Sequence, residues 1–135
     1  MVRLIAMDFD FTLVDYPPHG EHRICEALLD RLEDLAASGV RAGVVSGRTH
    51  ENLKDALLRA GARPNSRFPA FLICQDAYVY QADGAGAWTA EEAHNASVRS
   101  AMLSAMQALL PLFHQCMEGL RPENGRSSGT AAWNG

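Results

Sequence analysis

The sequence predicts an α/β protein built on a parallel sheet. Short apolar runs at 2–7, 40–45 and 68–74 alternate with two longer segments whose apolar residues recur every three or four positions. The runs are nearly continuous, which is typical of strands buried on both faces of a parallel sheet. The order strand, helix, strand, helix, strand favours right-handed crossovers, and such sheets bind ligands beyond the carboxyl ends of their strands.

The first strand is expected at 2–7, where Arg3 is the polar exception. Pro17, Pro18 and Gly20 then indicate a loop. A helix is expected at 22–37, because the apolar residues of that segment fall on one face. These residues are Ile24, Leu28, Leu32, Leu35 and Ala36, and Gly39 is the expected left-handed residue that ends the helix.

The second strand is expected at 40–45, and Thr49 is the expected N-cap of the next helix. The apolar stripe of that helix consists of Leu53, Ala56, Leu57 and Ala60, and Gly61 closes it. The segment "FPAFLIC" at 68–74 predicts the third strand.

The pattern changes after Cys74. The segment "AYVYQADGAGAW" has two short β-like runs around a turn rich in Asp and Gly, which predicts a β-hairpin. A helix is expected from about Glu91, and Pro111 should kink or end it. Its apolar stripe consists of Val98, Met102, Ala105, Leu109 and Phe113. We therefore expect a hairpin-plus-helix unit at 76–120, followed by a disordered or non-native tail at 121–135.

Composition argues against several classes of protein. The 135 residues suffice for one domain with a core, and the net charge of −4 argues against a nucleic-acid surface. Three separated cysteines, Cys25, Cys74 and Cys116, argue against a disulfide framework or a zinc site. The first residues lack the uncharged core of a signal peptide, and no apolar segment approaches the roughly 20 residues of a membrane span. A cytoplasmic protein without a membrane partner is expected.

Two aspartates, Asp8 and Asp10, end the first strand in "IAMDFDFTLVD". Side chains at this spacing on an extended chain point to the same side, and two neighbouring carboxylates favour a bound Mg²⁺. One carboxylate can act as a nucleophile and the other as a general acid and base. On the spacing alone, a polar loop in which Asp10 or Thr12 caps backbone groups is the alternative.

The surrounding residues favour catalysis. The stretch "DFDFTLVD" resembles the first signature of the haloacid dehalogenase superfamily, D-x-D-x-T-[LV], which also follows an apolar N-terminal strand. The resemblance implies that Asp8 is the nucleophile, which forms an aspartyl-phosphate, and a Mg²⁺ ligand. It implies that Asp10 is the general acid and base and, through its backbone carbonyl, the second ligand. Thr12 would brace the loop, and Phe11 stands where the family usually has glycine.

A second motif follows the second strand. In "GVVSGRTHENL", a hydroxyl and a glycine come directly after the apolar run, where they can donate hydrogen bonds to a phosphate. A Ser-Gly turn that starts a helix is the alternative if this motif stands alone. It resembles the family's second motif, often [ST]-G-R. The resemblance implies that Ser46 and the backbone N–H of Gly47 hold the phosphoryl group. Arg48 would position the loop or an anionic substrate.

The spacing of the motifs is similar to the Cof-type and sucrose-phosphatase-like branch of this family. Only one helix and one strand separate Asp8 from Ser46, so a cap does not fit there. The resemblance implies a HAD-like (Rossmannoid) parallel three-layer core over 1–75, incomplete here. It also implies the start of an α+β cap at 76–120, inserted after the third strand. Gln75-Asp76-Ala77 replaces the branch's Asn-Gly-Ala turn.

The family's later motifs, a lysine and a pair of acids, are not recognisable. The single lysine, Lys54, is expected to face solvent, and no aspartate follows Asp83. Glu91 and Glu92 suit the start of a helix better than a metal site. We therefore expect an N-terminal part of a longer enzyme, which would self-associate or pair with its missing C-terminal half.

The resulting prediction is a Mg²⁺-dependent phosphatase (hydrolase) that acts on a small phosphorylated metabolite. A non-catalytic truncated remnant, or a half-domain that binds phosphate or a partner, is the alternative. A phosphomutase with the same nucleophile is a third. His19 and His22 are expected to be surface residues and not metal ligands.

Overall fold

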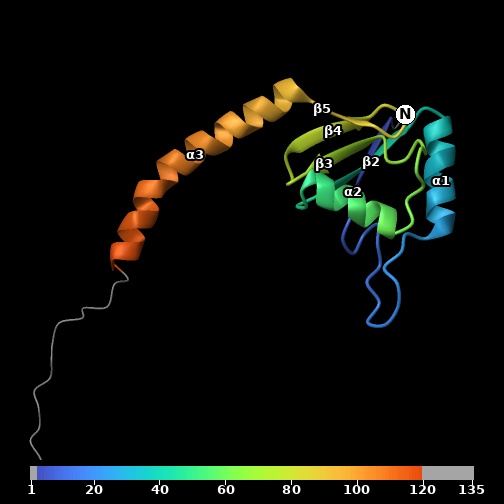
Figure 1. Ribbon diagram of the computed structural model, residues 1–135, viewed down its shortest axis with the longest axis horizontal. Helices are drawn as coiled ribbons and strands as arrows, with labels where there is room; N and C mark the ends of the chain where they lie inside the picture. Colours follow the sequence, from blue (N-terminus) through green and yellow to red (C-terminus); the bar gives the residue numbers. More distant parts are fainter. Residues whose placement is uncertain (1–2, 120–135) are drawn as a thin grey trace, which may run out of the picture. The chain divides into compact units, whose positions relative to one another are not determined.

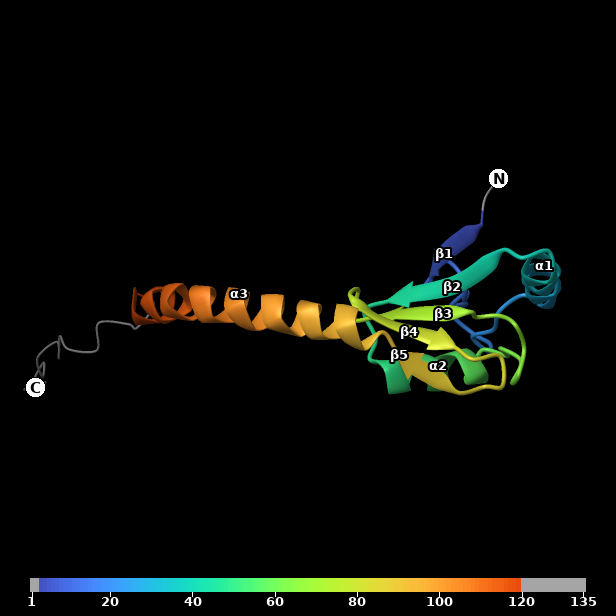
Figure 2. The same ribbon diagram turned by 90° about the horizontal axis from the view of Figure 1, so that it is seen from above.

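The protein has an α/β fold with a mixed five-stranded sheet. The computed structural model describes residues 3–119. Its strands are β1 (Leu4–Asp8), β2 (Arg41–Ser46), β3 (Phe71–Cys74), β4 (Tyr78–Ala82) and β5 (Trp88–Ala90) (Figure 1). Figure 2 shows them side by side in the order of the chain. The first three strands are parallel, as predicted, while β4 and β5 are each antiparallel to the strand before.

Three helices occur in the described residues: α1 (Glu26–Ala37), α2 (His50–Arg59) and α3 (Glu92–Gly119). The first begins later than the predicted start at residue 22, because the chain before it is extended and tied to α2. Ile24 donates its backbone N–H to the carbonyl of Ala60 at 2.9 Å. Thr49 caps α2 as predicted, since its hydroxyl oxygen accepts the N–H of Asn52 at 3.4 Å.

A single hydrophobic core lies between these first two helices and one face of the sheet. Val44 of β2 lies opposite Leu72 of β3, so both side chains point to the same face, and both are fully buried. They belong to one cluster with the buried leucines of both helices, which are Leu29, Leu32, Leu53 and Leu57. α1 and α2 therefore form one layer on one face.

The other face of the sheet carries different side chains. Leu4 and Asp8 are exposed there, and Val45 is partly buried. Phe71 is buried against Gly43, where an added Cβ would lie 2.5 Å from the Phe71 ring, so this position requires glycine. Within residues 3–119, α1 and α2 thus supply one of the two helix layers that a three-layer core requires.

The hairpin of β4 and β5 continues this sheet, because β4 pairs with β3. Asn95, near the start of α3, binds the same hairpin through its buried side chain. Its oxygen accepts the N–H of Val79 at 2.8 Å, and its NH₂ group donates to the Val79 carbonyl at 3.0 Å. The chain divides into a compact unit, Met1–Arg99, and a second unit from Ser100 onward. The predicted hairpin therefore belongs to the first unit.

The helix α3 continues through Pro111, so the proline does not end it. From Ser100 to residue 119, its large apolar side chains are exposed. They are Met102, Leu103, Met106, Leu109, Leu110, Leu112, Phe113 and Met117. Within the described residues, no helix has both the length and the apolar character that a membrane crossing requires. The tail expected at 121–135 lies outside these residues.

The turn between β3 and β4 has a backbone that its residues do not favour. Gln75 and Asp76 have φ angles of 51° and 57°, in the left-handed region that favours glycine and asparagine. Asn-Gly is the preferred pair for tight turns of this kind.

We expect the double substitution Gln75→Asn and Asp76→Gly to raise the free energy of unfolding by about 1 kcal/mol, measured by urea denaturation. The matched control Asp55→Gly, in the interior of α2, should lower it by a similar amount. A destabilised double variant would contradict the left-handed turn.

Candidate functional site

The residues predicted to carry function lie at the carboxyl ends of β1 and β2. Asp8 lies opposite Val45, and Ser46 is the next residue of β2. The Asp8 carboxylate is exposed and has no hydrogen-bond or ion-pair partner among the described residues. Since side chains alternate along a strand, Asp8 shares a face with Val45 while Ser46 points to the core face. A ligand that contacts both must lie beyond the strand ends, at the rim of the sheet.

Asp10 is held by Arg48 and Tyr16. Arg48 donates from Nη2 to Oδ1 of Asp10 at 2.6 Å and from Nε to Oδ2 at 3.2 Å. The Tyr16 hydroxyl also donates to Oδ1. The Arg48 guanidinium lies 5.3 Å from the centroid of the Phe9 ring, a cation–π contact that helps to hold it. Of the two roles expected for Arg48, the geometry supports positioning of the Asp10 loop.

These contacts shift the pKa values of Asp10 and Tyr16. The hydrogen bonds from Arg48 hold the pKa of Asp10 below its ordinary value, although partial burial opposes them, and the Tyr16 hydroxyl lowers it further. Burial and the hydrogen bond to Asp10 raise the pKa of Tyr16. At neutral pH, Asp10 is therefore an anion and Tyr16 keeps its proton.

The Asp10–Arg48 pair makes a prediction about pH. Because the pKa of Asp10 is lower in the folded than in the unfolded protein, its stabilisation is present above about pH 4 and is lost as the pH falls through the folded pKa. We expect Arg48→Gln to move the Asp10 pKa upward and to cost about 1 kcal/mol at pH 7, since both side chains are partly exposed. A ¹³C carboxyl titration and urea unfolding measure the two effects. The control Arg31→Gln, on α1, should leave unchanged both the Asp10 pKa and the contribution of Asp10 to the loss of stability at low pH. An unmoved Asp10 pKa in Arg48→Gln would contradict the pairing.

Ser46 presents a hydroxyl that is only half used. The side chain is 1% exposed, and its Oγ accepts the backbone N–H of Arg48 at 3.2 Å. Its own O–H has no acceptor among the described residues. Gly47, in contrast, is exposed, and a Cβ added there would lie 3.6 Å from Oδ2 of Asp76. A ligand oxygen at the rim could accept a hydrogen bond from the Ser46 O–H. The Asp76 carboxylate is a neighbour of this position that the sequence did not indicate.

The loop after β1 is braced by its backbone and not by Thr12. The Thr12 side chain is exposed, and its hydroxyl has no partner in the described part of the chain. The N–H of Val14 instead donates to the carbonyl of Phe9 at 3.1 Å. Phe11, 82% exposed, has a φ of 60°, which again lies in the region that favours glycine.

The rim offers few ligands for a metal ion. In residues 3–119, no group of three His, Cys, Asp or Glu side chains is arranged to hold one. Within the part of the chain that the structure describes, the Asp8 carboxylate has no partner, whereas that of Asp10 is paired with Arg48. Protein-bound Mg²⁺ is commonly held by one or two carboxylates, with water and phosphate oxygens completing its shell. The donors present fit a Mg²⁺ that a substrate phosphate helps to hold, and not a cage made of protein ligands alone.

A cavity of about 230 Å³ adjoins the Asp10–Arg48 pair. Besides Arg48, its polar lining is Tyr16, His22 and Arg59. His22 and His19 are both exposed, as expected. The contribution of Tyr16 and Arg59 was not predicted, because one comes from a loop and the other from the end of α2, and no local pattern connects them.

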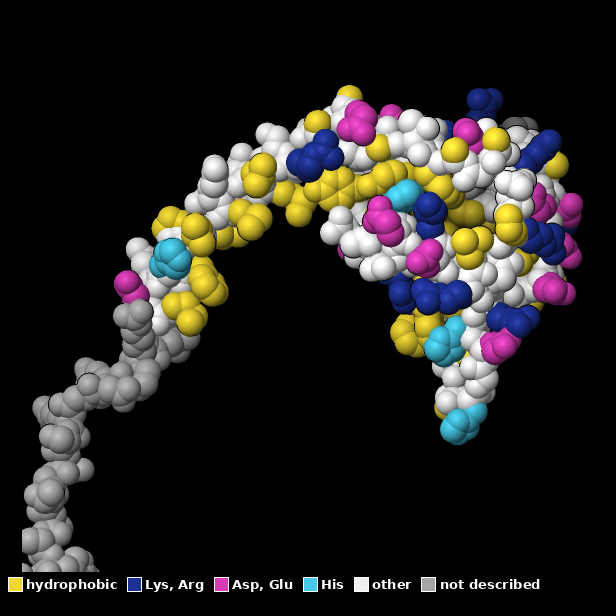
Figure 3. Space-filling model, in the orientation of Figure 1, with side chains coloured by type: hydrophobic (Ala, Val, Ile, Leu, Met, Phe, Trp, Pro, Cys, Tyr) yellow, Lys and Arg dark blue, Asp and Glu magenta, His cyan; other side chains and the backbone are white. Residues whose placement is uncertain are grey.

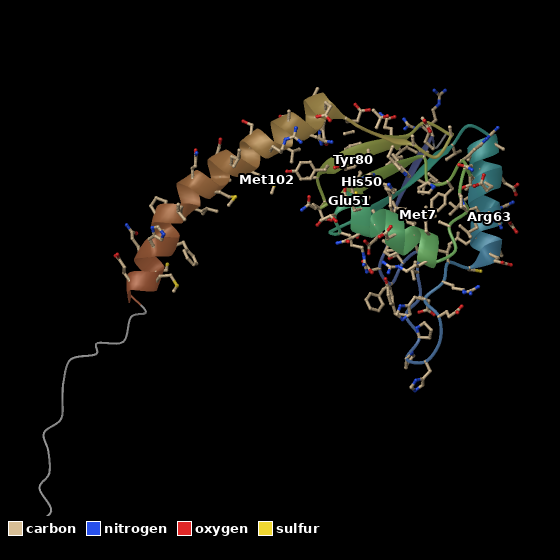
Figure 4. All side chains as sticks on the ribbon, viewed as in Figure 1. Met7, His50, Glu51, Arg63, Tyr80 and Met102 are labelled. Carbon is tan, nitrogen blue, oxygen red and sulfur yellow. The ribbon has the colours of Figure 1, made fainter. Side chains whose placement is uncertain are left out.

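A second polar feature lies where α2 begins beside the sheet. Figure 4 labels His50, Glu51 and Tyr80 there. The His50 ring stacks on Tyr80, with centroids 4.0 Å apart, and its buried Nε2 has no hydrogen-bond partner among the described residues. Burial lowers the pKa of His50, with the charge of Lys54 adding to the effect, so the neutral ring is favoured. We assign this side chain to packing.

Comparison with known proteins does not identify a family. No protein-family model matches the chain, and a search of curated proteins finds no match.

Proposed function

We propose that this chain carries the phosphoryl-transfer site of a Mg²⁺-dependent phosphatase of the haloacid dehalogenase type, which acts on a small phosphorylated metabolite. The observation that carries the proposal is the rim formed by two adjacent parallel strands. There, within the described residues, Asp8 has a carboxylate without a partner and Ser46 has a buried O–H without an acceptor. A negatively charged nucleophile and a spare donor are the complementary groups that a transferring phosphoryl group requires.

The backbone supports the resemblance where the residues depart from it. The family usually has glycine at the position of Phe11, and the related branch has Asn-Gly at Gln75-Asp76. All three residues have φ angles between 51° and 60°, the conformation that glycine and asparagine favour. The departures therefore alter the side chains while the backbone keeps the shape that the family's residues favour.

In the proposed reaction, a carboxylate oxygen of Asp8 attacks phosphorus as the bond from phosphorus to the leaving oxygen breaks. The products are an aspartyl-phosphate and an alcohol, whose oxygen takes a proton from Asp10. Water then attacks the same phosphorus and gives a proton to Asp10. The bond from phosphorus to the Asp8 oxygen breaks, and inorganic phosphate and the Asp8 carboxylate are released. Ser46 and the N–H of Gly47 would hold phosphoryl oxygens. When bound at Asp8 and the Asp10 carbonyl, Mg²⁺ would neutralise phosphate charge.

The role of Asp10 depends on Arg48. Paired as it is, the Asp10 carboxylate is ionised, which suits the step in which it takes a proton from water. Donation of a proton to the leaving group requires the protonated form, so the ion pair must open when substrate binds. Arg48 is therefore proposed as a positioning residue for Asp10.

A phosphatase assay of the full chain tests the proposal. Hydrolysis of small phosphate monoesters, followed as released phosphate, should require Mg²⁺ and stop in excess EDTA. Activity that persists without Mg²⁺, or the absence of both turnover and phosphate binding at the rim, would contradict the proposed site.

Non-catalytic phosphate binding is the second candidate, and the position of Lys54 favours it. The family's catalytic lysine should neutralise the phosphate, but Lys54 lines a different cavity of about 230 Å³ together with Arg63 and Trp88. That cavity includes Phe68, which precedes β3, and so lies toward the opposite end of the strand from Ser46. Saturable phosphate binding at Ser46 and Gly47 without turnover would identify this alternative.

A further inference from the structure

The cavity beside the Asp10–Arg48 pair has the lining of an anion site. Its polar side chains are Arg48, Arg59, His22 and Tyr16, and no acidic side chain of the described residues lines it. Figure 3 shows Lys or Arg side chains beside a His side chain where the loop after β1 meets α2. Guanidinium groups bind carboxylate and phosphate through paired N–H donors, so this lining indicates a carboxylate or phosphate ligand.

Arg59 supplies the second positive charge of this cavity. The charge of Arg48 is balanced by Asp10 at 2.6 Å. In the described part of the chain, no carboxylate lies within ion-pair distance of Arg59. Arg59 is the last residue of α2, where a cation also interacts favourably with the carbonyl end of the helix. A purely structural role for Arg59 is therefore the alternative that the test must separate.

The cavity is built from parts that hold one another in place. The rings of Phe11 and Tyr16 lie 4.8 Å apart, and those of Tyr16 and His22 lie 4.5 Å apart. The N–H of Ile24 donates to the carbonyl of Ala60, which ties the end of the loop to α2 beside Arg59. These contacts hold the loop together and tie its end to α2, where Arg48 and Arg59 line the cavity.

We infer that this cavity is a subsite for a second anionic group, carboxylate or phosphate, on the phosphorylated substrate. The inference rests on the proposed function, since Arg48 is the residue that the cavity shares with the Asp10 loop. A volume of about 230 Å³ is below the usual range for drug-sized ligands, so it suits a small charged group and a few carbons. The substrate class is then a small metabolite with an anionic group at each end.

A binding measurement tests the cavity independently of catalysis. The full chain, in EDTA and at constant ionic strength, is titrated with sodium malonate and, separately, sodium phosphate while NMR follows the Nε–H signals of Arg59 and Arg48. We expect saturable shifts, with a dissociation constant at least 5-fold higher in Arg59→Gln. The control Arg31→Gln removes the same charge from α1 and should change that constant less than 2-fold. Shifts that do not saturate, or equal constants in the wild type and Arg59→Gln, would overturn the anion site.

Turnover tests the link to the substrate. The wild type should favour 2-carboxyethyl phosphate over propyl phosphate by at least 10-fold in kcat/KM, and Arg59→Gln should lose this preference while Arg31→Gln keeps it. A preference that is absent in the wild type, or retained in Arg59→Gln, would overturn the subsite and leave the phosphatase intact. Saturable anion binding without hydrolysis of either ester would instead overturn the proposed function and, with it, the assignment to substrate.

Discussion

Replacement of Asp8 by asparagine is expected to lower the proposed phosphatase activity by at least about 10³-fold. The amide is a poor nucleophile and carries no charge for Mg²⁺, so both proposed roles are lost together. Because the Asp8 carboxylate has no partner among the described residues, the free energy of unfolding should change by less than about 0.5 kcal/mol. Released phosphate and urea unfolding measure the two quantities.

The matched control is Asp55→Asn, which removes the same charge from an exposed position of α2. Its activity should stay within about 2-fold of the wild type, as expected for a surface change away from the rim. Full activity in Asp8→Asn would show that another group attacks phosphorus. An equal loss in both variants would show that net charge, and not the position of Asp8, is responsible.

Replacement of Asn95 by alanine is expected to have the largest effect on stability, a loss of about 2–3 kcal/mol. The Asn95 side chain makes two hydrogen bonds to Val79 and is 1% exposed. Truncation removes the acceptor of the partly buried Val79 N–H, and a hydrogen-bonding group left unsatisfied in this way costs about 1–3 kcal/mol. The carbonyl of Val79 retains the N–H of Glu91 at 3.0 Å. Urea unfolding measures the loss.

Two further variants distinguish hydrogen bonding from loss of volume. Asn95→Asp keeps the acceptor for the Val79 N–H but places a carboxylate against the Val79 carbonyl, so a similar loss is expected. Asn52→Ala, at an exposed position in the first turn of α2, should change stability by less than about 0.5 kcal/mol. A small effect in both Asn95 variants would contradict the role of Asn95 in joining α3 to β4.

Local patterns predicted the elements of the first 75 residues well. Continuous apolar runs identified β1, β2 and β3, and the hydroxyl of Thr49 identified the start of α2, because those features act over a few neighbouring residues. The late start of α1 was missed for the opposite reason. Ile24 is apolar and buried, as the helical stripe requires. Its N–H, however, donates to the carbonyl of Ala60, which is far away in the sequence.

In the candidate site, too, features set by the order of the strands were predicted, and contacts between residues distant in the sequence were not. The places of Asp8 and Ser46 at neighbouring strand ends follow from strand order and are confirmed. The partners of Asp10 were not predictable, since Arg48 lies 38 residues and Tyr16 six residues from it along the chain, and no local pattern connects them. Asp8 and Asp10 were expected to point to the same side because the chain was taken to be extended through both residues. The strand β1 instead ends at Asp8, and the Asp10 carboxylate is paired with Arg48.

Binding of beryllofluoride, which mimics a phosphoryl group on a carboxylate, is the most direct test of phosphoryl binding at the rim. With Mg²⁺ present, we expect one bound ¹⁹F species per chain, together with amide shifts at Asp8, Ser46 and Gly47. The bound signal should vanish in EDTA and in Asp8→Asn, and persist in Asp55→Asn. A wild-type chain that binds no beryllofluoride, or an Asp8→Asn variant that binds it equally well, would contradict the proposed site.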